Sequence, residues 1–323
     1  MKQRIAVRYI LLCALAIAAM LSATRAEAQT CTIGSGSGSY GTVNVLAGTA
    51  IDTTSTFTVS CTGTANQTVR LCIEMGAGSS PPGPSGERAL TTGANFLDHE
   101  FYSDAARTQL WGSWGSVIVA YGTNGVSFDL PLGPTGSASH VFTLFARILA
   151  GQQAKVPGAY TWTGSSPGLR YGFAAAAACP TGSQTAISGG TTWTATIAAS
   201  CQVSATTLNF GSTGVLAASV DSTSTLTATC TSTTPYNIGL NAGTGTGATV
   251  AARKMTSGAS TVTYSLFTTS ARTTVWGNTI GTDTVSATGS GLGQSSTVFG
   301  RVPAQTTPKP ATYTDTIVVT ITY

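Results

Sequence analysis

Charged side chains are scarce in this sequence, in which Asp, Glu, Lys and Arg make up only 8% of 323 residues. Four of the 15 basic residues and one of the 11 acidic residues lie within residues 1–28, so the rest of the chain has a net charge of +1. Binding to nucleic acid or to an anionic membrane uses a basic surface, which this composition does not provide. We therefore expect a surface covered mainly by Ser, Thr, Asn, Gln and Gly, and no nucleic-acid partner.

Side chains that support catalysis or metal binding are also few. The chain has two histidines, His99 and His140, and no C-x-x-C pair of the kind that binds zinc. Residues 98–100 (Asp-His-Glu) contain three potential metal ligands, but neighbouring residues of a strand point to opposite faces. We expect a solvated strand end or loop there, and we predict neither a metal site nor a cofactor.

Two short motifs resemble enzyme signatures without the groups that the chemistry needs. Residues 164–168 match G-x-S-x-G, yet Pro167 has no N–H for an oxyanion hole and no histidine follows it in the sequence. Residues 36–41 match G-x-G-x-x-G, but no strand is predicted before them and no helix after them, which favours a flexible loop. We expect this chain not to be an enzyme.

Sustained helical periodicity is absent after residue 28. Residues 1–28 have the organisation of a signal peptide, with basic residues at the start, an apolar run over residues 9–23, and Ala26 and Ala28 at a small-x-small cleavage site. The apolar run is short for a membrane span. The sequence predicts secretion and a mature chain that begins near Gln29.

Alternation of Thr with apolar side chains indicates β-strands in both halves of the chain. It occurs in residues 51–61, 225–230 and 314–323, and such a pattern suits a half-buried sheet. Clusters of Gly, Ser, Asn and Pro interrupt these runs at turn positions. An all-β fold with two tandem β-sandwiches of ordinary domain size is therefore predicted.

The two halves repeat each other in the same order. Residues 101–112 are echoed by residues 267–277, and Arg147 and the segment that follows it are matched by Arg301 and its own following segment. An unchanged order with altered spacing indicates a duplicated domain with different loop lengths. Trp111 and Trp276 occupy equivalent places in the two copies, so we expect both to be structural.

The cysteines follow the same repeat. Of seven, Cys13 lies in the predicted signal peptide and six remain, an even number suited to an oxidising compartment. The repeat selects Cys31–Cys61 and the equivalent Cys201–Cys230, which leaves Cys72 and Cys179 as a further pair in the first copy. Closing a loop of about 30 residues stabilises a fold by roughly 3–4 kcal/mol in the chain-entropy model.

The domain boundary is predicted in the polar residues 180–192, with residues 29–185 and 191–323 as the two domains. Just after it, Trp193, Ala195 and Ile197 alternate with threonines. This segment is interpreted as the first strand of the second domain. An alternative hypothesis is that it docks partly on the first domain and stiffens the pair.

A set of motifs distinguishes residues 190–323. After Cys201 and Cys230, the set consists of residues 208–211 (Leu-Asn-Phe-Gly), 235–243, 253–255, 264–267, 271–277, 299–303 and 313–323. As a set it resembles the spore coat protein U domain, the pilin-type domain of archaic (Csu-type) chaperone–usher pili. The first half matches more loosely, through Cys31, Cys61, Arg88, Arg147 and residues 107–111 and 157–160. It departs by its extra disulfide, by residues 81–84 and by lacking the closing Tyr-Thr-Asp-Thr strand.

The resemblance implies two immunoglobulin-like β-sandwiches, the second an incomplete pilin fold whose groove takes a strand from another protein. The implied partners are a periplasmic pilus chaperone, an outer-membrane usher and the donor strand of a neighbouring pilin. Only Gln29 and Thr30 would precede Cys31 in the mature chain, too few to form a donor strand. The chain therefore resembles a two-domain tip adhesin, secreted through the periplasm to the pilus tip for attachment and biofilm formation.

Adhesion would require residues peculiar to the first domain that meet an abiotic or host surface. The predicted adhesive residues are apolar and close to turn residues: Phe96, Leu97, Trp114, Trp162 and Leu169, with residues 117–119 as a further possibility that also suits a core strand. Two alternatives remain: a structural secreted coat or minor fimbrial subunit without its own ligand, and a carbohydrate-binding module whose aromatic residues stack on sugars.

Overall fold

The computed structural model describes residues 29–79, 81–83, 86–114, 122, 124–173, 178–179 and 185–323. The predicted signal peptide and residues 117–119 lie outside these described residues. Within the described part, no helix is long and apolar enough to cross a membrane. The one helical element described is a single 3-10 turn, η1 (Val45–Ala47).

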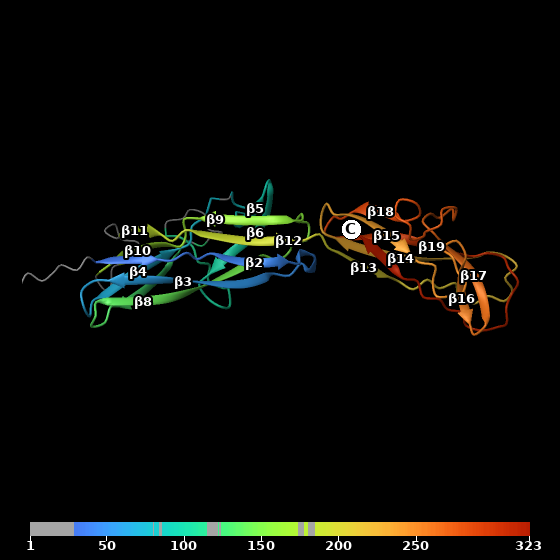
Figure 1. Ribbon diagram of the computed structural model, residues 1–323, viewed down its shortest axis with the longest axis horizontal. Helices are drawn as coiled ribbons and strands as arrows, with labels where there is room; N and C mark the ends of the chain where they lie inside the picture. The colour runs from blue at the N-terminus through green and yellow to red at the C-terminus, as the bar shows by residue number, and fades with distance from the viewer. Residues whose placement is uncertain are drawn as a thin grey trace, which may run out of the picture.

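The described chain forms two β-sandwiches that lie end to end along the longest axis of the molecule (Figure 1). In the first, an eight-stranded sheet of order β1-β3-β8-β6-β5-β9-β12-β2 packs on a four-stranded sheet of order β11-β10-β4-β7. Its strands are β1 (Thr30–Ile33), β2 (Gly38–Val43), β3 (Ile51–Thr62), β4 (Thr68–Glu74), β5 (Arg88–Thr92), β6 (Asn95–Tyr102), β7 (Val126–Pro131), β8 (Ser137–Ile148), β9 (Gly158–Gly164), β10 (Gly168–Gly172), β11 (Thr185–Ser188) and β12 (Thr191–Ile197).

The second sandwich is smaller. A five-stranded sheet of order β13-β14-β19-β17-β16 faces a three-stranded sheet of order β18-β15-β20. Its strands are β13 (Cys201–Ala205), β14 (Val220–Cys230), β15 (Pro235–Leu240), β16 (Arg253–Ser257), β17 (Ser260–Phe267), β18 (Val285–Thr288), β19 (Gly293–Val302) and β20 (Val319–Thr322). Each sandwich has its own hydrophobic core, as the all-β, two-domain prediction requires.

The alternation of buried and outward-facing residues along a strand shows which of its faces packs on the core. In β14, Leu226, Ala228 and Cys230 are buried while the threonines between them face outward, as expected for a sheet with one face on the core.

Two of the predictions about individual strands were wrong. Residues 38–41 of the glycine motif belong to strand β2 (Gly38–Val43) rather than to a flexible loop, and of the predicted closing strand 314–323 only β20 is a strand.

The duplication is visible in pairing and contacts. Asp52 of β3 accepts two hydrogen bonds, of 2.7 and 2.9 Å, from Arg147 of β8. Asp221 of β14 does the same with Arg301 of β19, at 2.7 and 2.8 Å. The two equivalent tryptophans are both buried, and the indole N–H of each donates to a carbonyl of the facing strand: Trp111 to Ile73 and Trp276 to Ile238.

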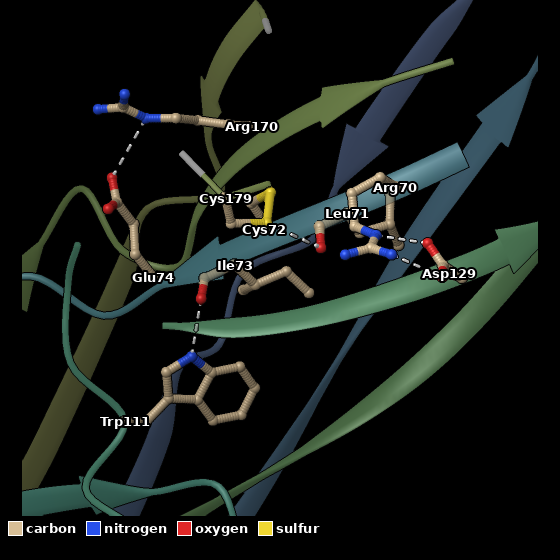
Figure 2. Close-up of a disulfide and its surroundings, with 9 residues drawn as sticks. All are labelled: Arg70, Leu71, Cys72, Ile73, Glu74, Trp111, Asp129, Arg170 and Cys179. Carbon is tan, nitrogen blue, oxygen red and sulfur yellow. Dashed lines mark hydrogen bonds and ion pairs between the residues drawn. A yellow bond between two sulfur atoms is a disulfide. The ribbon is translucent and has the colours of Figure 1, made fainter. Parts of the chain in front are cut away.

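Three disulfides cross-link strands of the sandwiches, and their pairs are those predicted from the repeat and from the two cysteines that it left over. Cys31–Cys61 joins β1 to β3 and Cys201–Cys230 joins β13 to β14. Cys72–Cys179 ties β4 to the chain that follows β10 (Figure 2). This third bridge closes a span of 107 residues and has no counterpart in the second domain.

Strand β12 corrects the predicted domain boundary. It pairs over its full length with β9, antiparallel, and also pairs with β2, parallel, so it is an integral strand of the first sandwich. Its role there is larger than the partial docking considered from the sequence. The second domain begins at β13, after a link of three residues, 198–200. The alternation of Trp193, Ala195 and Ile197 fills the core of the first domain, where all three are at most 2% exposed.

Replacing Ile197 by Asp should unfold the first domain, because an unpaired carboxylate would take the place of a fully buried aliphatic side chain. We expect a loss of more than about 3 kcal/mol in the free energy of unfolding, measured by urea denaturation. The matched control is Thr196→Asp at the neighbouring exposed position, which should change stability by less than about 0.5 kcal/mol. Equal stability of the two variants would show that β12 does not close this core.

Candidate functional site

The second domain carries two adjoining hollows that together form a groove along one side of its core. Their volumes are about 510 and 630 Å³, and both are lined by Leu208, Phe210, Met255 and Tyr313. One wall is the irregular segment 206–216 after β13, and the other is the segment 307–318 before β20. We call this feature the open groove.

The floor of the open groove is the core of the second domain itself. Leu226, Leu240, Leu266 and Val298 line the hollow and are at most 6% exposed. Above this floor, Leu208, Phe210 and Ile317 are partly exposed, and apolar side chains exposed along a groove are normally covered by another chain.

One wall of the open groove is a backbone segment that belongs to no strand and is almost unpaired. In residues 312–317 the only sheet contact is an isolated bridge between Thr314 and Thr256 on the core side. The equivalent strand of the first domain, β9, makes the same kind of contact through Thr161 with Thr91. On its other side, β9 also pairs with all seven residues of β12. Within residues 201–323, which the structure describes throughout, no strand takes the place of β12.

A polar network closes one side of the open groove. The Tyr264 hydroxyl donates to Asp315 at 2.8 Å, and Asp315 also accepts from the backbone N–H and hydroxyl of Thr244, at 2.8 and 2.9 Å. Burial and the neighbouring Asp315 carboxylate raise the pKa of Tyr264 far above its ordinary value. The tyrosine therefore remains a neutral donor to the Asp315 carboxylate, which lines the groove.

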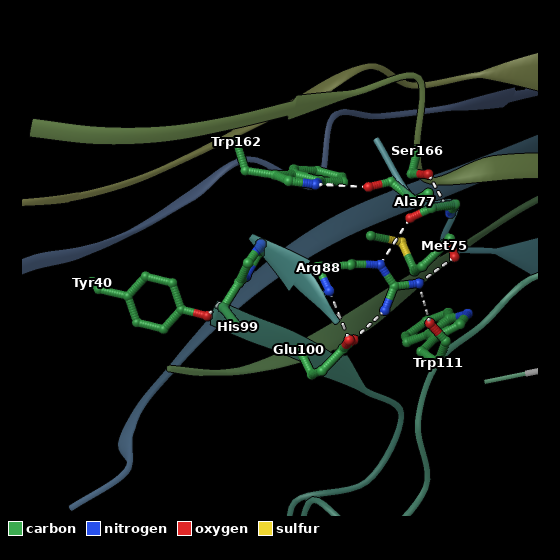
Figure 3. Close-up of polar contacts among 10 residues, drawn as sticks. Tyr40, Met75, Ala77, Arg88, His99, Glu100, Trp111, Trp162 and Ser166 are labelled. Carbon is green, nitrogen blue, oxygen red and sulfur yellow. Dashed lines mark hydrogen bonds and ion pairs between the residues drawn. The ribbon is translucent and has the colours of Figure 1, made fainter. Parts of the chain in front are cut away.

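In each domain, a buried arginine next to the core tryptophan binds several backbone carbonyls. Arg88 donates to the carbonyls of Met75, Gly76 and Trp111 and forms an ion pair with Glu100 (Figure 3). In the second domain, Arg253 likewise donates to the carbonyls of Leu240, Asn241 and Trp276, between 2.7 and 2.9 Å. From the sequence, both arginines were noted as positions of the family resemblance, but their binding of carbonyls was not predicted. The one signal that could have indicated it is that charged residues are rare in this chain.

The Asp-His-Glu triplet is not the solvated strand end that the sequence suggested. It lies in β6, where His99 and Glu100 are at most 2% exposed. The Tyr40 hydroxyl lies 3.3 Å from Nδ1 of His99 (Figure 3), while Asp98 pairs with Lys155 at 3.3 Å. In the described part of the chain, no three His, Cys, Asp or Glu side chains gather as a metal site would require.

The predicted adhesive residues divide into two groups. Leu97, Trp162 and Leu169 are at most 1% exposed and belong to the core of the first domain, so their prediction as surface contacts was wrong. The indole of Trp162, taken from sequence to lie near a turn, donates to the carbonyl of Ala77 from inside the sandwich. Phe96 and Trp114 are partly exposed and remain predictions.

A family comparison matches most of the chain. The sequence model of the family described as Spore Coat Protein U domain matches residues 17–163 and 187–320. The chain belongs to this family. The first matched region covers most of the first sandwich, and the second covers β12 and nearly all of the second sandwich, so the spore coat protein U domain is present twice in tandem. No curated protein sequence matches the chain.

Comparison with solved structures supports the same fold. The chain is similar to the structure of the CsuC-CsuE chaperone-tip adhesion subunit pre-assembly complex from archaic chaperone-usher Csu pili of Acinetobacter baumannii. The match has 18% identity and a TM-score of 0.52, and it covers 91% of this chain and 100% of that chain. A match to the CupB6 tip adhesin from Pseudomonas aeruginosa has 12% identity and a TM-score of 0.39, covering 91% and 94%.

The buried His99 predicts a pH dependence of the first domain. Burial, and secondarily the charge of Arg88, lower the pKa of His99 in the fold, so the unfolded chain takes up a proton that the folded chain does not. Stability should therefore fall as pH decreases below about 6.5, by up to about 1.4 kcal/mol per pH unit. Urea denaturation at pH 7.5, 6.5 and 5.5 measures this slope. His99→Gln should flatten it, and an unchanged slope in that variant would contradict the assignment.

Proposed function

We propose that this protein is a secreted subunit of a chaperone–usher type pilus whose second domain accepts a donor strand from a neighbouring subunit. The observation that carries the proposal is the difference between the two cores: β12 closes the first, and the open groove leaves the second without such a strand. Added strands gain main-chain hydrogen bonds at a free edge and bury alternate side chains in the groove. Residues 312–317 and the floor of the open groove offer both.

A chaperone is the partner expected before assembly. An uncovered apolar groove beside a free strand edge promotes aggregation unless it is occupied. A periplasmic chaperone would protect it until an outer-membrane usher exchanges the chaperone for the donor strand. The similar Csu structure is itself a complex of a chaperone with a tip adhesion subunit, and family membership makes the same kind of partner reasonable here.

The closed first domain supports a terminal position in the fibre. Because β12 belongs to the chain itself, the first sandwich needs no donor and its outer loops are free to meet a surface. We propose that the protein occupies the pilus tip, outside the cell, and serves attachment to an abiotic or host surface and biofilm formation. Phe96 and Trp114 are the remaining partly exposed residues among those predicted to make the contact.

Substitutions at two neighbouring residues test the groove. Ile317 lines the open groove, whereas Val318 is 54% exposed. Ile317→Asp should reduce incorporation of the chain into fibres more than tenfold, because a carboxylate would face the apolar donor side chains. Val318→Asp should leave incorporation unchanged. Immunoblots of sheared fibres measure incorporation, with thermal unfolding of the purified variants as the control for folding. Equal incorporation of the two folded variants would refute assembly through the open groove.

The adhesive role has a separate test. Phe96→Ala with Trp114→Ala should lower attachment of piliated cells to polystyrene severalfold, because the apolar area available for burial decreases. Fibre yield should stay the same, since neither residue lies in the second domain. Attachment is counted against a strain that lacks the chain. Unchanged attachment with normal fibres would favour a structural subunit without a ligand of its own.

A further inference from the structure

We propose that the open groove selects a donor segment with a small side chain opposite Leu208 and excludes an aromatic one. This inference rests on the proposed function and specifies the partner's sequence. The first domain supplies the template, because its own β12 occupies the position that a donor would occupy in the second domain. The two domains differ at the residue beneath that position.

The equivalence of the two grooves can be fixed residue by residue. Gly38 and Leu208 each stand seven residues after the first cysteine of their domain, and Tyr40 and Phe210 each stand nine after it. The structure supports this register, because Tyr40 meets His99 edge-on at 6.1 Å. Phe210 meets Tyr264 edge-on at 6.0 Å in the same way.

In the first domain, glycine makes room for a tryptophan. Trp193 of β12 pairs with Gly38, and a Cβ added to Gly38 would lie 2.5 Å from Cη2 of the indole. The indole N–H donates to the Gly36 carbonyl at 2.9 Å, and the side chain is fully buried. Any residue larger than glycine at position 38 would therefore displace Trp193.

In the second domain, the corresponding space is partly filled by the chain itself. Leu208 and Phe210 lie against Gly300 of β19, where an added Cβ would come within 2.8 Å of Leu208 Cδ1 and 3.0 Å of Phe210 Cζ. Leu208 also lines both hollows of the open groove. An indole in the register of Trp193 would meet this leucine where Trp193 meets a glycine.

The aromatic surroundings of Trp193 are only partly present in the second domain, where Phe210 stands in place of Tyr40 but Leu266 stands in place of Phe101. Trp193 packs near Tyr40 and Phe101, with ring centroids 5.5 and 5.3 Å away, and it pairs across the strands with Trp162.

The edge strands can be aligned through their tyrosines. Tyr160 donates to the carbonyl four residues before it, and Tyr313 does the same, both at 2.8 Å. Two residues after these tyrosines stand Trp162 in the first domain and Asp315 in the second. A donor side chain in the register of Trp193 would therefore lie between an aliphatic group and a carboxylate, a site that suits a small residue.

Peptides and one exchange of groove residues test the proposal. The probes are two fluorescein-labelled peptides, residues 189–199 of this chain and the same peptide with Trp193→Ala. Fluorescence anisotropy with the full mature chain should give at least tenfold tighter binding of the alanine peptide. In the Leu208→Gly variant the order should reverse, because the glycine restores the space present at position 38.

The outcomes separate the inference from the proposed function. Equal binding of both peptides to the unchanged chain, or preference for tryptophan, would overturn the inference while leaving donor-strand acceptance intact. Binding of neither peptide by either protein would contradict the proposed function and the inference with it. Gly38→Leu provides an independent measurement in the first domain, where displacement of Trp193 should lower the unfolding midpoint. An unchanged midpoint would also count against the proposal that the residue at this position limits the size of the side chain opposite it.

Discussion

The rest of this molecule depends on one constraint: the apolar core of each sandwich must be covered along one side by a strand. A sheet can end safely where its last strand faces water with polar side chains, but here the strand position next to β9, and next to residues 312–317 in the second domain, covers apolar side chains of the core. In the first domain β12 occupies that place with Trp193, Ala195 and Ile197. In the second domain the same geometry leaves Leu226, Leu240 and Leu266 beneath an unpaired edge. One architecture therefore yields a finished domain and an unfinished one.

The buried arginines explain how the unfinished domain keeps its shape. Arg253 of β16 binds carbonyl groups from β15 and from the Trp276 segment, so these three parts of the chain are fixed around one guanidinium. Such a planar group with several donors can bind the carbonyls of several chain segments at once. The first domain uses Arg88 in the same way and adds Glu100 as a counter-ion. These contacts hold the strands beside the groove without requiring an occupant.

Much of the fold could be predicted because it depends on local pattern and duplication. Strand alternation located β3 and β14, and the repeated cysteines identified the same three pairs that the structure contains. Pattern does not say which sheet a strand joins, so β12 was assigned to the wrong domain. Its pairing with β9 and β2 depends on contacts between distant parts of the chain, such as the hydrogen bond between Ser39 and Thr194, which are 155 residues apart.

The residues of the candidate site were harder to predict, because the sequence does not say which side chains are buried and which are exposed. Trp162 stands beside turn residues in sequence and yet lies wholly inside the first sandwich, while His99 and Glu100 sit in its core despite their polarity. The open groove itself could be expected only from resemblance. Its size preference at Leu208 required the two domains to be compared atom by atom.

The three-residue link between β12 and β13 has a mechanical consequence. Tension applied to the second domain reaches the first through residues 198–200 and enters β12 directly. Because β12 is hydrogen-bonded to β9 on one side and β2 on the other, a pull along the strand loads both ladders in shear. Many hydrogen bonds then resist together instead of opening one after another. The strand that completes the first domain is thus also the element through which the domain bears load.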